Sequence, residues 1–118
     1  MCIRDSLCSP HNPVGRVWTA EELKKLLEIC KKHDVIVVSD EIHQDIIPGS
    51  RKHIPTDSVN DIGAKVVTLS AASKTFNLAA LNHSFAIIPD EALRKQYDDC
   101  LLYTSPPSVS STSCSTST

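Results

Sequence analysis

The chain has 118 residues, of which 41% are hydrophobic, and its formal net charge is −2. No cluster of Lys and Arg marks a nucleic-acid-binding face, and no apolar run approaches the roughly 20 residues needed to cross a bilayer. The five cysteines are odd in number and include no C-x-x-C pair, which argues against a disulfide framework or a zinc site. We therefore expect a soluble cytoplasmic protein without a metal, a nucleic-acid partner or a membrane partner.

The two ends of the chain differ in composition from its middle. Residues 104–118 are Ser, Thr and Pro apart from Val109 and Cys114, and such a stretch buries too little apolar surface to offset its ordering entropy. We expect residues 103–118 to be a disordered tail. Residues 1–6 show no periodicity and no apolar signal-peptide core. Our hypothesis is that both ends are foreign to the gene; a full-length relative that keeps the Ser/Thr tail would contradict it.

The first predicted elements are a strand, a turn and a helix. Leu7-Cys8-Ser9 has the character of a strand end, and the P-H-N-P-V-G sequence that follows predicts a turn in which Gly15 takes a positive φ. Thr19 and Glu22 have the spacing of a capping box, so we expect a helix from there to about Lys32 or His33. Its predicted inner face is apolar and consists of Leu23, Leu26, Leu27 and Cys30, whereas Lys24, Lys25, Lys31 and Lys32 form its solvated face.

Three more strands and a second helix are predicted further along the chain. The strands are residues 35–38, 65–69 and 84–88, of which the first is a continuous β-branched run typical of a buried parallel strand. Asp90 is expected to cap a helix from Glu91 to about Leu102, with Leu93 and Tyr97 on its inner side. The alternation predicts an α/β fold with a mostly parallel sheet, because right-handed crossovers make the first strands parallel.

Polar residues follow three of the predicted strands. Asn12 comes after the first strand, Asp40 after the second, and Lys74 four residues beyond Ser70 at the end of the third. Ligands of open α/β sheets bind at the carboxyl edge, so these groups are expected to meet there. A lysine can form a Schiff base with pyridoxal phosphate (PLP), a carboxylate can keep the pyridine nitrogen protonated, and an amide or imidazole such as His43 can contact the phenolic oxygen.

Each of these residues also has an ordinary structural explanation. Asn12-Pro13 is typical of a turn, and Asp40-Glu41 is typical of a solvated helix N-terminus. Lys74 taken alone is most simply explained as a solvated surface residue. The histidines at 11, 43, 53 and 83 are, taken singly, ordinary loop or surface residues. Only the joint arrangement favours a cofactor site, and spacing alone leaves both interpretations open.

Three linked motifs carry a family resemblance. They are residues 9–18 (S-P-H-N-P-V-G-R-V-W), 39–43 (S-D-E-I-H) and 72–79 (A-S-K-T-F-N-L-A). Together they resemble the fold-type I PLP enzymes of the class I/II aminotransferase superfamily, and specifically its MalY/PatB branch of cystathionine β-lyases. The similarity covers about Leu7 to Asp99. It implies that residues 7–102 are a central part of the three-layer α/β/α large domain of these enzymes, whose full-length members form homodimers.

The resemblance also implies roles for single residues. Lys74 would be the Schiff-base lysine, Asp40 would pair with the pyridinium nitrogen, and Asn12 would donate to the phenolic oxygen. His43 stands where typical aminotransferases have a tyrosine, so the resemblance implies a second contact to that oxygen. Ser73 or Ser70 is expected to compensate for two departures, since Ala71 and Asn82 stand where aminotransferases carry a phosphate-binding serine and arginine.

These departures favour the lyase branch. The resemblance therefore implies a fragment of a PLP-dependent C–S β-lyase that converts cystathionine or a cysteine S-conjugate to a thiol, pyruvate and ammonia. The alternatives are a class I/II aminotransferase and an inactive fragment or binding module. The upstream phosphate loop, the ring-stacking aromatic and the downstream carboxylate-binding arginine of the family are expected to lie outside the chain, so we expect it to be inactive alone.

Overall fold

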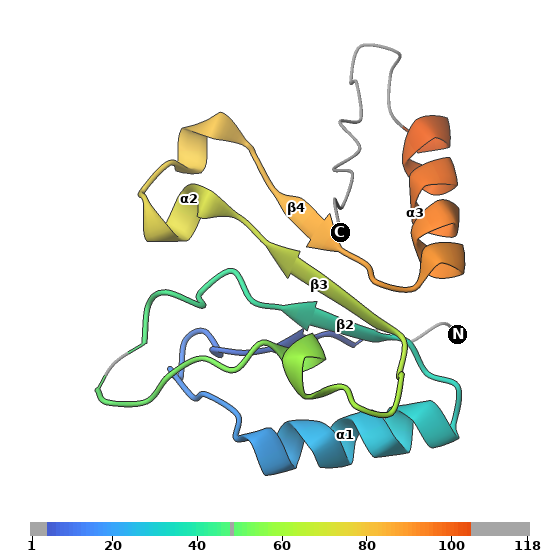
Figure 1. The fold of residues 1–118 in the computed structure, drawn as a ribbon. Coiled ribbons are helices and arrows are strands. Elements are labelled where there is room, and N and C mark those ends of the chain that lie inside the picture. The colour runs from blue at the N-terminus through green and yellow to red at the C-terminus, as the bar shows by residue number, and fades with distance from the viewer. Residues whose placement is uncertain (1–4, 48, 105–118) are drawn as a thin grey trace, which may run out of the picture.

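A computed structural model describes residues 5–47 and 49–104, and its centre is a four-stranded sheet with the order β1-β2-β3-β4 (Figure 1). The strands are β1 (Leu7–Cys8), β2 (Val37–Asp40), β3 (Val66–Ser70) and β4 (Phe85–Ile87). The first three strands are parallel, and β4 runs antiparallel to β3. The predicted α/β class with a mostly parallel sheet is confirmed.

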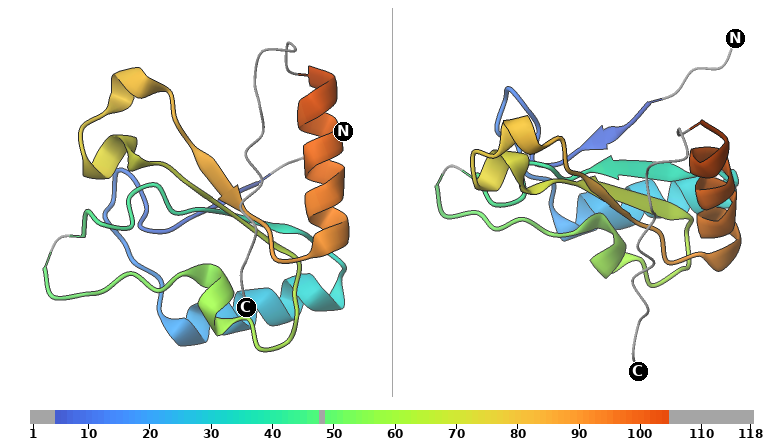
Figure 2. Two further views of the ribbon diagram at one scale, coloured as in Figure 1. Left: turned by 45° about the horizontal axis from the view of Figure 1, so that its top comes forward. Right: turned by 90° about the horizontal axis from the view of Figure 1, so that it is seen from above.

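Helical segments follow each of the four strands. They are α1 (Ala20–Lys32), η1 (Thr56–Val59), α2 (Ala72–Thr75), η2 (Ala79–Leu81) and α3 (Glu91–Thr104), of which η1 and η2 are single 3₁₀ turns. Figure 2 shows α1 and η1 on the same side of the sheet, while α3 follows β4 and crosses the direction of α1. No helix in the described part of the chain is both long and apolar enough to cross a membrane.

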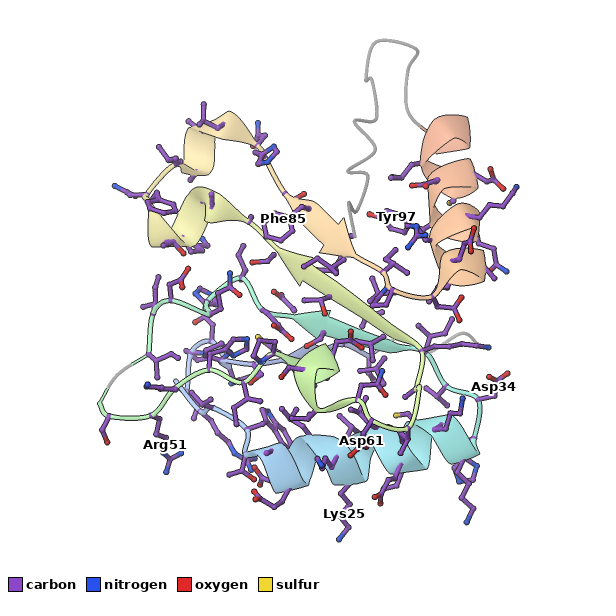
Figure 3. The ribbon with its side chains drawn as sticks, viewed as in Figure 1. Lys25, Asp34, Arg51, Asp61, Phe85 and Tyr97 are labelled. Atoms are coloured by element: carbon purple, nitrogen blue, oxygen red, sulfur yellow. The ribbon has the colours of Figure 1, made fainter. Side chains whose placement is uncertain are left out.

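Helix α1 begins at the predicted capping box. The Glu22 amide donates to Thr19 Oγ1 (3.3 Å), and the Thr19 amide donates to Glu22 Oε2 (3.0 Å). Of the predicted inner face, Leu23 and Leu27 are fully buried, whereas Lys25 points away from the sheet (Figure 3). Helix α1 is therefore held by a satisfied first turn and an apolar stripe, as its sequence predicts.

The core lies between α1 and the two central strands. It is a cluster of Leu27, Val37, Ala64 and Val66, with Cys30 and Val59 packed against it. Burying a Leu or Val side chain fully contributes about 1.5–3 kcal/mol. This cluster fixes the face of β2 and β3 that turns toward α1, and side-chain alternation turns Val38 and Asp40 to the opposite face.

The start of β2 differs from the prediction. The strand begins at Val37, and Val35 and Ile36 are 49% and 43% exposed. Asp34 takes a left-handed conformation (φ 52°), and the Val35 amide donates back to the Cys30 carbonyl (2.9 Å). The chain therefore uses these residues to end the helix, which delays the strand by two residues.

Strand β4 is an edge strand of the sheet, and α3 follows it. Asp90 caps α3 as predicted, since its Oδ1 accepts from the Leu93 amide (2.8 Å). The helix ends at Thr104, two residues beyond the expected Leu102; the remainder of the expected tail lies outside the described residues. Tyr97 lies on the side of α3 toward β4 (Figure 3) but is 37% exposed, and Phe85 is 43% exposed. The packing here is looser than beneath α1.

Candidate functional site

The sheet register brings the carboxyl ends of the first three strands to one edge. Cys8 is opposite Asp40, and Asp40 is opposite Leu69, in strands that are about 4.8 Å apart. Asn12 lies four residues after Cys8, and Lys74 lies five residues after Leu69. Figure 1 shows the segments that follow β1, β2 and β3 at the same end of the sheet. The predicted meeting of these segments at one edge is therefore observed.

Asn12 lies in a closed turn after β1. The His11 amide donates to the Arg16 carbonyl (2.9 Å), and the Gly15 amide donates to the His11 carbonyl (2.6 Å). Gly15 has φ 72°, the positive value predicted from the sequence. These bonds occupy the backbone of the turn and leave the Asn12 amide group exposed, with no side-chain partner in the described part of the chain.

Asp40 is the last residue of β2 and is half-buried. Its Oδ1 accepts a hydrogen bond from the Ile42 amide (3.1 Å), and its backbone carbonyl accepts from the Ser9 amide (3.0 Å). Its second carboxylate oxygen has no partner among residues 5–47 and 49–104. His43 follows in a turn, where its carbonyl accepts from the Ile46 amide (2.9 Å) and its half-buried ring likewise has no described partner.

Helix α2 carries Ser73 and Lys74. The Lys74 amine is exposed and makes no hydrogen bond or ion pair within the described residues, while Ser73 is half-buried. Thr75 Oγ1 donates to Asp45 Oδ2 (2.7 Å), so α2 is tied to the loop that follows Asp40. Lys74 is thus held near the segment of Asp40 and His43 while its own amine stays available.

The two departures from the aminotransferase pattern have local structural explanations. Ala71 is 7% exposed and lies before the first turn of α2 without a side-chain cap. Asn82 takes a left-handed conformation (φ 45°) at the end of η2, a conformation that Asn tolerates better than most residues. Ser70 is 5% exposed and its hydroxyl is buried without a partner in the described structure. Of the two serines considered, Ser73 is the more accessible.

A buried carboxylate lies beside Asp40. Glu41 is 1% exposed, in contrast to the solvated position that its place after a strand predicts. Its Oε1 accepts from Ser39 Oγ (2.9 Å) and from the Thr56 amide (2.9 Å), and its Oε2 lies 2.8 Å from His53 Nε2. Ser39 and Thr56 also share a hydrogen bond between their hydroxyls (2.8 Å). We call these four residues the Glu41 cluster.

Burial and hydrogen bonding act in opposite directions on Glu41. Burial favours the neutral acid and raises the pKa of Glu41. Hydrogen bonds from His53, the Thr56 amide and Ser39 favour the carboxylate and together lower the pKa by more than burial raises it. The pKa of Glu41 therefore lies below its ordinary value of 4.5. Glu41 is therefore an anion near neutral pH. Both carboxylate oxygens of Glu41 accept hydrogen bonds, whereas Asp40 Oδ2 has no partner among the described residues.

The site thus presents an amine, a carboxylate oxygen, an amide and an imidazole at one sheet edge. These groups could bind a planar ligand that carries an aldehyde and a basic ring nitrogen. Within the described residues, no group of three or more His, Cys, Asp or Glu side chains is arranged to hold a metal ion.

Comparison with known proteins identifies the family. The family model described as aminotransferase class I and II matches residues 6–117. The chain belongs to the class I and II aminotransferase family. Among curated members, cystathionine beta-lyase PatB of Bacillus subtilis is 50% identical over 96 residues, which are 80% of this chain and 25% of PatB. Protein MalY of Escherichia coli is 42% identical over 91 residues, or 77% of this chain and 23% of MalY.

Solved structures agree with this family. A PLP-bound putative aminotransferase from Clostridium difficile 630 has 52% identity and a TM-score of 0.77, over 82% of this chain and 25% of that one. Cystalysin from Treponema denticola, whose structure contains pyridoxal 5'-phosphate, has 40% identity and a TM-score of 0.78, over 83% and 25% of the two chains. The resemblance and the fold-type I architecture inferred from the motifs are confirmed. The chain spans about a quarter of the length of these relatives.

Proposed function

We propose that this chain carries part of the cofactor site of a PLP-dependent C–S β-lyase. Its substrates would be cystathionine or related cysteine S-conjugates, and the products a thiol, pyruvate and ammonia. The main support is the set of polar groups at the carboxyl ends of the strands that have no partner among the described residues. The chain is a member of the class I and II aminotransferase family, and its similar relatives include PatB and MalY. The whole enzyme is proposed to be a cytoplasmic homodimer.

The residues at the edge fit PLP chemically. Lys74 offers an amine with no other described partner, and Asp40 offers an open carboxylate oxygen for a protonated ring nitrogen. Asn12 and His43 offer donors for the phenolic oxygen, and Ser73 offers a hydroxyl for the phosphate. The Glu41 cluster, in contrast, uses its polar atoms on itself, so it is not expected to bind the cofactor directly.

PLP, when bound, supplies an electron sink for the carbanion formed at the substrate Cα. Lys74 would hold the cofactor through its amine, and the same amine, when free and neutral, would accept the Cα proton of the substrate. The Asp40 carboxylate would pair with the ring nitrogen and keep it protonated. Lys74 would pass the Cα proton to the departing β-thiolate, and one water would supply the keto oxygen of pyruvate as ammonia leaves, so that substrate and water balance thiol, pyruvate and ammonia.

A class I/II aminotransferase is the second candidate. It is supported by the 52% identity to a putative aminotransferase, and it uses the same proton removal by the lysine. The two functions differ in their need for a keto-acid acceptor. The full-length protein should release pyruvate from cystathionine without any keto acid if the lyase proposal is right, whereas dependence on an added keto acid would favour the aminotransferase.

The third candidate is a chain that binds no cofactor by itself. Incubation of the chain with PLP, reduction with borohydride and peptide mass mapping would test this. We expect the label on Lys74 and its loss in Lys74→Ala. Lys25→Ala is a matched control, because Lys25 is also exposed but lies on α1 and points away from the sheet (Figure 3). Equal labelling of both lysines, or none, would contradict a cofactor site in this chain.

A further inference from the structure

The Glu41 cluster connects two separate parts of the chain. The Glu41 side chain reaches across the segment after β2 to Thr56 at the first position of η1 and to His53 just before it. The Glu41 and His53 side chains are 2% and 8% exposed. A buried carboxylate is costly unless its oxygens receive hydrogen bonds. Both oxygens of Glu41 do, so the contact holds residues 41 and 53–56 together.

The same residue is also fixed to the sheet. The Glu41 amide donates to the Leu69 carbonyl of β3 (2.9 Å), and its carbonyl accepts from the Gln44 amide (2.9 Å). Its side chain shares the α1 side of the sheet with Ser39, to which it is hydrogen-bonded. Asp40, the residue between them, therefore turns to the other face. Anchoring Glu41 on one face sets the direction of Asp40 on the other.

His43 depends on the same anchor. It lies two residues after Glu41 in the turn closed by the Gln44-to-Glu41 and Ile46-to-His43 backbone hydrogen bonds, both 2.9 Å. The turn begins at the residue that the cluster holds. Movement of Glu41 would thus displace Asp40 and His43 together, although neither belongs to the cluster.

We propose that Glu41 and His53 are positioning residues, which hold Asp40 and His43 in the orientation required at the cofactor site. This role rests on the proposed function, because Asp40 and His43 matter for chemistry only if PLP binds there. Glu41 and His53 would act through these neighbours and would not touch cofactor or substrate.

The Ile42 amide provides a direct readout of the Asp40 orientation, because it donates to Asp40 Oδ1. The Ile46 amide reports the turn of His43 in the same way. In Glu41→Ala and His53→Ala we expect exchange through local opening at Ile42 and Ile46 to accelerate about tenfold, after subtraction of exchange through global unfolding, which Val67 in β3 reports. Equal acceleration at all three amides, or none at Ile42 and Ile46, would overturn the proposal.

Glu41→Gln separates geometry from charge. Its amide oxygen can still accept from Ser39 and the Thr56 amide, and its NH₂ group can face His53 Nε2, so we expect exchange at Ile42 close to that of the wild type. If Glu41→Ala does not fold, Glu41→Gln and His53→Ala still give the comparison. Glu28→Gln on the exposed surface of α1 is the charge-matched control. Loss of protection in Glu41→Gln equal to that in His53→Ala would overturn the proposal.

Binding of PLP provides a second, independent test of the positioning role. With PLP labelled by ¹⁵N in the ring, the nitrogen resonance reports the contact with Asp40. We expect His53→Ala to move it in the same direction as Asp40→Asn and Glu41→Gln to leave it in place; an unchanged resonance in His53→Ala would overturn the positioning role. If the wild-type chain takes up no PLP, the proposed cofactor site fails, whereas the exchange measurements still decide whether Glu41 and His53 hold Asp40.

Discussion

Replacing His53 with Ala tests the energetics of the Glu41 cluster. The substitution removes the 2.8 Å hydrogen bond to Glu41 Oε2 and leaves that oxygen without a protein partner in a side chain that is 2% exposed. A hydrogen bond to a charged group contributes about 1.5–3 kcal/mol, and a buried charged acceptor left without a partner costs more than the roughly 1–3 kcal/mol of a neutral one. Because Oε1 keeps both of its donors, we expect a loss of about 2–4 kcal/mol in the free energy of unfolding near pH 7.

The loss should depend on pH. Since the folded-state pKa of Glu41 lies below 4.5, its contribution is fully present above about pH 4.5 and disappears as the pH falls through the lower folded value. The difference between wild type and His53→Ala should therefore shrink in acid. Urea unfolding followed by circular dichroism measures both effects, and His33→Ala, at an exposed position at the end of α1, is the control. A difference below about 0.5 kcal/mol at pH 7, or one that is unchanged in acid, would refute this reasoning.

Four further substitutions have definite expected outcomes. Leu27→Ala should cost about 2–5 kcal/mol in urea unfolding, because Leu27 is fully buried in the core, whereas Ile29→Ala at a 53% exposed position should stay within about 0.5 kcal/mol. Thr19→Ala removes the cap of α1 and should cost about 1 kcal/mol, seen as a lower thermal midpoint. Lys74→Ala should change the unfolding free energy by less than about 0.5 kcal/mol while abolishing borohydride labelling, and a large destabilisation would indicate a structural role instead.

Features with a local cause could be predicted from the sequence. The positive φ of Gly15, the capping box of Thr19 and Glu22, and the cap at Asp90 each depend on residues a few positions apart, and the structure has all three. The common end of the sheet for the segments that carry Asn12, Asp40 and Lys74 followed from crossover connections, which make successive strands parallel.

Features that depend on distant segments could not be predicted. The residues of β4 do not reveal that the strand runs antiparallel to β3. Glu41 and Asp40 look equivalent in the sequence, because the uninterrupted β-branched run before them has no alternation from which to read the faces of the strand. Asp40 and Glu41 differ because His53 and Thr56, which lie beyond the following loop, form hydrogen bonds with Glu41.

The side chains of Asp40 and Glu41 point to opposite faces of the sheet. The number of residues in β2 is therefore more important for their placement than the identity of those residues. Conservative exchanges among the valines would preserve the phase of the strand. A single inserted residue between Val37 and Asp40 would instead rotate every later side chain to the other face. It would direct Asp40 into the space beside His53 and Thr56 and release Glu41 on the opposite side. Insertions and deletions in these four residues should therefore be far less tolerated than substitutions that keep their number.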